Sequence, residues 1–132
     1  MSTLIATIEK IQNVDSLNIV TFDFNGITLR MMSLDLNESI KVGTKVSLNM
    51  KPTSVAIGKN LSGELSYSNK INSKIVAIKE GELLCSVQLL AKDILIESII
   101  TLESAKRMNL KIGNMVIALI KASELSIAKV LS

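Results

Sequence analysis

The stretch "SIKVGTKVSLNMKPTSV", residues 39–55, returns later in the chain as "MNLKIGNMVIALIKASEL", residues 108–125. Both stretches keep the frame K-[VI]-G-x-x-V-x-x-x-x-K, in which a glycine turn leads into an apolar strand that ends at a lysine. An internal repeat has to be identified before any element is assigned, because it determines the architecture. Two copies in 132 residues indicate a tandem duplication of a small unit rather than a solenoid.

The repeat extends beyond this frame when residues 1–62 are aligned with residues 71–132 without gaps, and twelve positions are then identical. Each copy shows three apolar strands, a short helix, a glycine turn and two more strands. Strands are expected at 3–11, 17–24, 27–32, 45–50 and 53–57 in the first copy and at 71–79, 83–90, 94–101, 115–121 and 124–131 in the second, with helices at 33–40 and 102–110.

This order of elements is typical of a five-stranded barrel of the oligonucleotide/oligosaccharide-binding (OB) type. We therefore predict an all-β fold, a β-barrel with short helices, made of two tandem OB-fold-like five-stranded barrels. The first barrel comprises residues 1–62 and the second residues 70–132. Residues 63–69 link them and supply the N-terminal binding segment of the second. A barrel of this size is marginally stable alone, so we expect a homo-oligomer.

The composition argues against several classes of function. The chain has no His and a single Cys, Cys85, which argues against the usual zinc sites and an intramolecular disulfide. Without a paired acidic motif or a glycine-rich phosphate loop, the chain is not expected to be an enzyme. A net charge of only +3, with two Phe, one Tyr and no Trp, disfavours nucleic-acid binding. Neither a membrane span nor a signal peptide is recognisable, so a cytoplasmic location is expected.

Hydroxyl and lysine side chains at the ends of elements in the second copy are groups that a site for a compact anion would need. Thr101 and Ser104 stand in the first turn of the expected helix, where free backbone N–H groups favour an anion. Lys121 supplies a positive charge at a strand end, and Ser123 adds a hydroxyl. The alternatives are that Thr101 and Ser104 cap the helix, that Lys121 is a solvated strand end, and that Ser123 and Thr53 form turns.

Four motifs of the second copy resemble the molybdate-binding Mop domain, the small barrel of molbindins. They are Ser66-Tyr67-Ser68-Asn69 before the first strand, Ile100-Thr101-Leu102-Glu103-Ser104 at the helix start, Ile112-Gly113-Asn114-Met115-Val116 at the turn and Ile120-Lys121-Ala122-Ser123 at the strand end. The same domain is the TOBE domain of molybdate transporters and molybdate-responsive regulators. Together with the first copy, which keeps the frame but few of the motifs, the chain resembles a di-Mop, molbindin-like protein.

The resemblance implies that molybdate or tungstate binds where copies meet, with no organic cofactor and no direct ligation of the metal by side chains. The implied oxyanion-binding residues are Ser66, Tyr67, Ser68, Asn69, Thr101, Ser104, Lys121, Ala122 and Ser123, joined by Lys51, Pro52 and Thr53 of the first copy. Ser68 stands where the family has an arginine, which removes a charge and a bidentate donor. Met31 and Leu34 replace the threonine and serine in the first copy.

The function implied is intracellular molybdate or tungstate binding, for storage or homeostasis, by a dimer or trimer of di-Mop chains. The alternative is a molybdate-sensing regulatory or interaction module that has no DNA-binding domain of its own and acts through a molybdate-responsive regulator. A barrel that binds oligonucleotides is the least favoured hypothesis, because it would need aromatic platforms for stacking. Neither a nucleic acid nor a membrane is expected as a partner.

Overall fold

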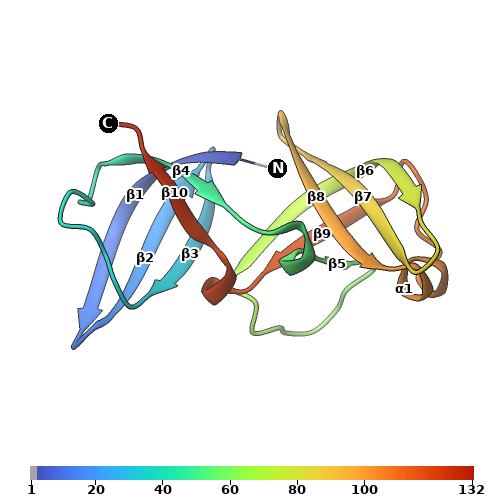
Figure 1. Ribbon diagram of the computed structural model, residues 1–132, viewed down its shortest axis with the longest axis horizontal. Helices are drawn as coiled ribbons and strands as arrows, with labels where there is room; N and C mark the ends of the chain where they lie inside the picture. The colour runs from blue at the N-terminus through green and yellow to red at the C-terminus, as the bar shows by residue number, and fades with distance from the viewer. Residues whose placement is uncertain (1–2) are drawn as a thin grey trace.

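Two curled antiparallel sheets of five strands each lie side by side along the long axis of the molecule (Figure 1). The computed structural model describes residues 3–132. Its elements in chain order are β1 (Thr3–Val14), β2 (Leu17–Phe24), β3 (Ile27–Ser33), β4 (Lys45–Asn49), the 3-10 helix η1 (Pro52–Ser54), β5 (Ala56–Gly58), β6 (Asn69–Glu80), β7 (Leu84–Ala91), β8 (Ile94–Thr101), α1 (Leu102–Arg107), β9 (Met115–Ile120), the 3-10 helix η2 (Ala122–Glu124) and β10 (Ser126–Val130). The predicted all-β class with two five-stranded barrels is confirmed.

The last strand of each repeat lies in the sheet of the other repeat. Strand β5, from the first repeat, pairs with β9, whereas β10, from the second repeat, pairs with β4. Figure 1 shows the red β10 beside β4 in one barrel and β5 beside β9 in the other. Each barrel is therefore completed by a strand of the other copy. The predicted division into one barrel of residues 1–62 and one of residues 70–132 does not include this exchange.

The two 3-10 helices carry the chain from one barrel to the other. Helix η1 connects β4 with β5, and η2 connects β9 with β10. Pro52 stands at the start of η1, where its fixed φ angle suits a helical turn. The buried hydroxyl of Ser98 on β8 donates a 2.6 Å hydrogen bond to the carbonyl of Val55, just after η1. The crossing segment is thus fixed to β8 of the second barrel.

The core follows from the strict alternation of apolar side chains along the strands. On β2, residues Asn18, Val20, Phe22 and Phe24 are buried, and the residues between them are less so. The buried side chains of both barrels form one continuous cluster. Because a barrel of this size has little core of its own, sharing a core stabilises both. Within residues 3–132, no helix has the length and apolar character needed to cross a bilayer.

The glycine turn of the repeated frame is fixed to the first strand of its barrel. The amide of Ile8 donates to the carbonyl of Thr44 at 2.9 Å, and the amide of Gly43 donates to the carbonyl of Ile8 at 2.8 Å. Gly43 has a φ angle of 91°, in the region where a side chain would be strained. The repeated lysine-glycine frame therefore has a structural role, which is to fasten the turn onto β1.

The second repeat contains the same contacts, with Ile75 bonded to Gly113 and Asn114 at 2.8 and 2.9 Å. Ile75 follows its counterpart Ile8 by 67 residues, while Gly113 follows Gly43 by 70, so the second repeat holds three more residues between these points. Both β1 and β6 also carry their β-bulge directly after this isoleucine. The gapless alignment is therefore wrong before the turn, where the true offset is 67.

The three additional residues lie in the segment that contains α1, the helix predicted at 102–110. The prediction is confirmed, although the helix ends at Arg107. Its cap is Thr101, whose hydroxyl oxygen accepts a hydrogen bond from the amide of Ser104 at 3.1 Å. Glu103 in the first turn and Lys106 in the last complement the helix dipole.

The helix predicted at 33–40 in the first repeat is absent from the structure. The hydroxyl of Ser33 donates to the carbonyl of Asp35 at 2.7 Å, and the carboxamide oxygen of Asn37 accepts from the amide of Ser39 at 2.9 Å. Such local side-chain bonds compete with a helix for the same backbone groups. With three residues fewer than its counterpart, this loop folds into turns instead.

Candidate oxyanion-binding site

The two lysines at the strand ends occupy matching positions in the centre of the molecule. Lys51 immediately precedes η1 and Lys121 immediately precedes η2, with almost the same backbone angles (φ −71°, ψ 138° and φ −69°, ψ 148°). Both side chains are exposed. The helices lie between the barrels in Figure 1, so the candidates Pro52, Thr53, Ala122 and Ser123, which belong to these helices, lie there too.

The segment before β6 lies beside Lys121. The ladder between β6 and β9 begins with Asn69 opposite Ile120, so Ser68 and Lys121 are the residues directly beyond its end. Residues paired in an antiparallel ladder have Cα atoms about 5 Å apart. The backbones of Ser68 and Lys121 are therefore close together, and the exposed Ser66 and half-buried Tyr67 directly precede Ser68. This is a cluster of donors with one cation.

Asn69 has a different role from its neighbours, because its side chain is fully buried. Its carboxamide oxygen accepts from the amide of Arg30 at 2.7 Å, and its carboxamide nitrogen donates to the carbonyl of Arg30 at 2.9 Å. The side chain thus binds the outer edge of β3 as a partner strand would. Asn69 fixes the start of β6 to the first barrel. Both its carboxamide oxygen and its carboxamide nitrogen are used in these hydrogen bonds.

Thr101 and Ser104 lie at the opposite end of the second barrel from Lys121, since Figure 1 places α1 at the far tip and η2 at the centre. The two hydroxyls bond to each other at 2.9 Å, and Arg107 donates to the Ser104 hydroxyl at 3.1 Å. Arg107 also pairs with Glu103 at 2.9 Å. The capping alternative therefore describes their role in one chain, and they could meet Lys121 only in a neighbouring chain.

The first repeat contributes less to such a site. Lys51 extends beyond the ladder of β1 and β4, whose last pair is Thr3 with Asn49, so the residues that would face it lie outside the described chain. Thr53 is exposed on η1. By the corrected offset, the counterpart of Thr101 is Leu34, and no helix follows it. The first copy therefore offers one lysine and one hydroxyl without a capped helix.

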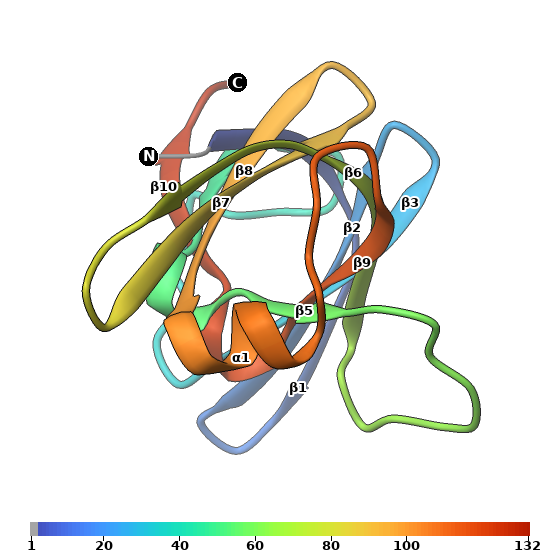
Figure 2. The same cartoon turned by 90° about the vertical axis from the view of Figure 1, so that its right-hand side faces the viewer.

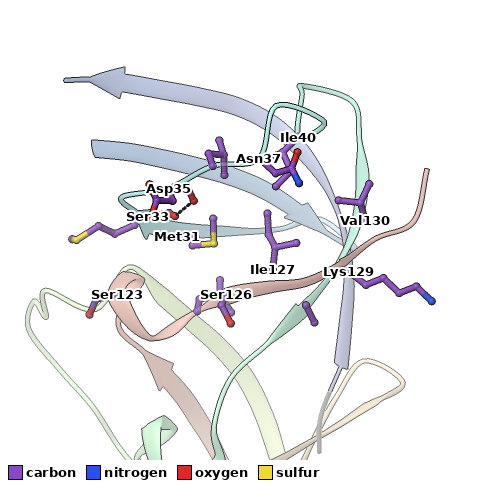
Figure 3. A pocket seen from close by; sticks show the side chains of 14 residues that line it. Met31, Ser33, Asp35, Asn37, Ile40, Ser123, Ser126, Ile127, Lys129 and Val130 are labelled. Carbon is purple, nitrogen blue, oxygen red and sulfur yellow. Dashed lines mark hydrogen bonds between the residues drawn. The ribbon is translucent and has the colours of Figure 1, made fainter. Parts of the chain in front are cut away.

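A cavity of about 440 Å³ lies between β10 and the loop after β3 (Figure 3). Met31, Ile40 and Ile127 form its apolar part, while Ser123 lies at its edge and Lys129 extends away from it. An oxyanion needs several donors and a cation directed at it. The cavity lacks that arrangement, so the strand-end cluster around Lys121 is the better candidate.

Two further observations limit the chemistry of the described residues. Within residues 3–132, no three His, Cys, Asp or Glu side chains gather in a way that could hold a metal ion. Burial, with a smaller contribution from the Glu80 carboxylate, raises the pKa of the Cys85 thiol. Cys85 is therefore a buried apolar side chain rather than a nucleophile.

Sequence reasoning did not identify Arg30 as a neighbour of the candidate segment. The contact between a side-chain amide and a main chain 39 residues away leaves no periodic signal in the sequence. It did identify Ser68 and Lys121, which stand directly beyond the end of the ladder of β6 and β9.

Residues 65–127 match the model of the TOBE domain family. The predicted resemblance to the Mop/TOBE family is thereby confirmed, and the match covers most of the second repeat. Among solved structures, the chain is similar to the cytoplasmic molybdate-binding protein ModG in a form with molybdate bound. The TM-score is 0.89 with 24% sequence identity, and the match covers 95% of this chain and 93% of that chain. This likeness shows a shared fold over both barrels. No curated protein matched the sequence.

Proposed function

We propose that this chain is a binding protein for molybdate or tungstate, and that it has no enzymatic activity. The observation that carries the proposal is that Lys121 and Ser68 both stand directly beyond the end of the ladder of β6 and β9, whose last pair is Asn69 with Ile120. The fold is shared with ModG, which is described as binding molybdate, and the TOBE match covers the same segment. These similarities support the oxyanion as the ligand.

The chemistry of the cluster suits this ligand. Molybdate and tungstate are tetrahedral dianions whose oxygens only accept hydrogen bonds. Ser66 and Ser68 provide hydroxyl donors, Lys121 provides an ammonium group, and Ser123 follows it on η2. Hydrogen bonds from a charged donor to an anionic oxygen are the stronger kind. We propose that the protein binds the intact oxyanion, with no organic cofactor.

We further propose that the complete sites form between chains of a homo-oligomer, a dimer or a trimer. One chain keeps Thr101 and Ser104 at the tip of its second barrel and Lys121 at its centre (Figure 1). A second chain could bring its helix start to the lysine of the first. The exposed apolar residues Leu83, Ile112 and Met115 are available for such contacts. In this account the protein serves as a cytoplasmic store of the oxyanion.

Isothermal titration of the purified chain with molybdate, tungstate, sulfate and phosphate tests the proposal. Saturable heat with molybdate and tungstate, and weaker or no heat with sulfate and phosphate, is expected. No heat with any of the four anions would refute it. Light scattering after size-exclusion chromatography, with and without molybdate, then tests the oligomer, since a monomer in both conditions would contradict interface sites.

A further inference from the structure

The structure brings an arginine of the first repeat to the candidate site of the second. Asn69, the first residue of β6, binds both backbone groups of Arg30 on β3, at 2.7 and 2.9 Å. Ser68 directly precedes Asn69, and Lys121 directly follows Ile120, the partner of Asn69 in the ladder. The backbone of Arg30 is therefore hydrogen-bonded to the residue that directly follows the candidate donor Ser68.

The side chain of Arg30 is free to reach outward. Its neighbours Leu29 and Met31 are buried, so the alternation of β3 places the Arg30 side chain on the exposed outer face. Among the residues that the structure describes, no ion pair of the Arg30 guanidinium group is found. Its backbone is bonded to Asn69, the residue after Ser68, so a long exposed cation starts next to the candidate segment.

The charge of the ligand gives this cation a role. Lys121 supplies one positive charge beside the start of β6, whereas molybdate and tungstate carry two negative charges. A hydroxyl such as that of Ser68 donates one hydrogen bond and adds no charge. A guanidinium group offers two parallel donors that match two oxygens of a tetrahedral anion, and it remains charged at any physiological pH.

We propose that Arg30 is the second cation of the oxyanion site, and that Asn69 is the positioning residue that holds it there. The inference rests on the proposed function. It means that the bound anion bridges the two barrels of one chain, with Arg30 from the first and Lys121 from the second. The competing cation is Lys70, the second residue of β6, which is exposed and follows Ser68 by two residues.

Titration of four variants with tungstate separates these cations. The variants are Arg30→Gln, Arg30→Lys, Lys70→Gln and Lys10→Gln, the last being the control. Lys10 lies opposite Thr21, which in turn lies opposite Arg30. The substitution Lys10→Gln therefore removes one positive charge from the same sheet, two strands away from Arg30. Tyr67 is the only tyrosine in a chain without tryptophan, so its fluorescence reports events at the segment itself.

The expected result is a loss of affinity of roughly tenfold to a hundredfold in Arg30→Gln, the range for a charged hydrogen bond. Arg30→Lys should lose less, and Lys10→Gln should stay within about twofold because salt screens a distant charge. Thermal melting should change little in Arg30→Gln, because Asn69 binds only its main chain. If Arg30→Gln binds tungstate as tightly as the wild type, the inference is wrong, whether or not Lys70→Gln loses affinity. The proposed function would then still stand. Absence of tungstate binding in the wild type would remove both.

Discussion

The hydroxyl of Ser54 donates a 3.0 Å hydrogen bond to the carboxylate of Glu124, and these two residues occupy the same position in the two repeats, 70 residues apart. Ser54 ends η1 and Glu124 ends η2, so the contact joins the two crossing segments. The two segments that begin at the candidate lysines Lys51 and Lys121 and lead into the exchanged strands are therefore bonded to each other.

The candidate lysine of the second repeat should dominate binding. Lys121→Ala should weaken molybdate affinity by roughly tenfold to a hundredfold, because it removes a charged hydrogen bond. Lys51→Ala should have a smaller effect, and Lys111→Ala, an exposed lysine of the glycine turn, serves as the control. Calorimetric titration measures all three. Equal affinities in the three variants would contradict the role of Lys121.

The amide of Asn69 should contribute strongly to stability. Asn69→Ala leaves the amide and carbonyl of Arg30 without their partner, which should lower the free energy of unfolding by roughly 2–4 kcal/mol. Asn72→Ala, on the exposed face of the same strand, should change it by less than about 0.5 kcal/mol. Urea denaturation followed by circular dichroism compares the two. Equal midpoints would show that the contact contributes nothing.

The exchanged segment after β5 should stabilise the helix of the other repeat. The ammonium group of Lys59 donates to the carbonyls of Met108 and Asn109, just after α1, at 2.9 and 3.1 Å, and Figure 2 shows α1 next to β5. Lys59→Met should lower the free energy of unfolding by about 0.5–1.5 kcal/mol. Lys129→Met is the matched control, because Lys129 holds the same repeat position beside a loop without a helix. A larger loss in the control would contradict the capping role.

The buried thiol should be unreactive in the native protein. Cys85 should not react with a disulfide reagent at pH 8 and should react fully in urea, because burial raises the pKa of its thiol above the ordinary 9.0. The unfolded thiol ionises first as the pH rises, so ionisation favours the unfolded state and stability falls through that range. Cys85→Ala should remove this part of the pH dependence. Fast labelling of the native protein would contradict the burial.

The sequence predicts the strands well because period-two alternation is strong. The expected strand 17–24 coincides with β2, and Thr101 caps α1 at the expected residue. Alternation shows which face of a strand is buried, but it does not show which sheet receives the strand. Strands β5 and β10 are short, and their apolar patterns do not distinguish one sheet from the other. Their exchange could therefore not be predicted from the sequence.

Two other errors have physical causes of the same kind. In the gapless alignment Ile5 is identical to Ile75 and Ile8 to Ile78, but these identities arise by chance between two alternating apolar strands. They favoured an offset of 70 where the structure shows an offset of 67. At the candidate site, the lysine and hydroxyl positions could be predicted from motif order. The contribution of Arg30 could not, because a side-chain amide bound to a distant main chain has no local pattern.

A crystal of the protein soaked in tungstate provides the most direct test of the account, because the anomalous signal of tungsten locates the anion without assumptions about its site. We expect a tungsten position within hydrogen-bonding reach of Lys121 and Ser68, with the Arg30 guanidinium turned toward it. A tungsten position only in the cavity beside β10, or no ordered tungsten at a saturating concentration, would contradict it.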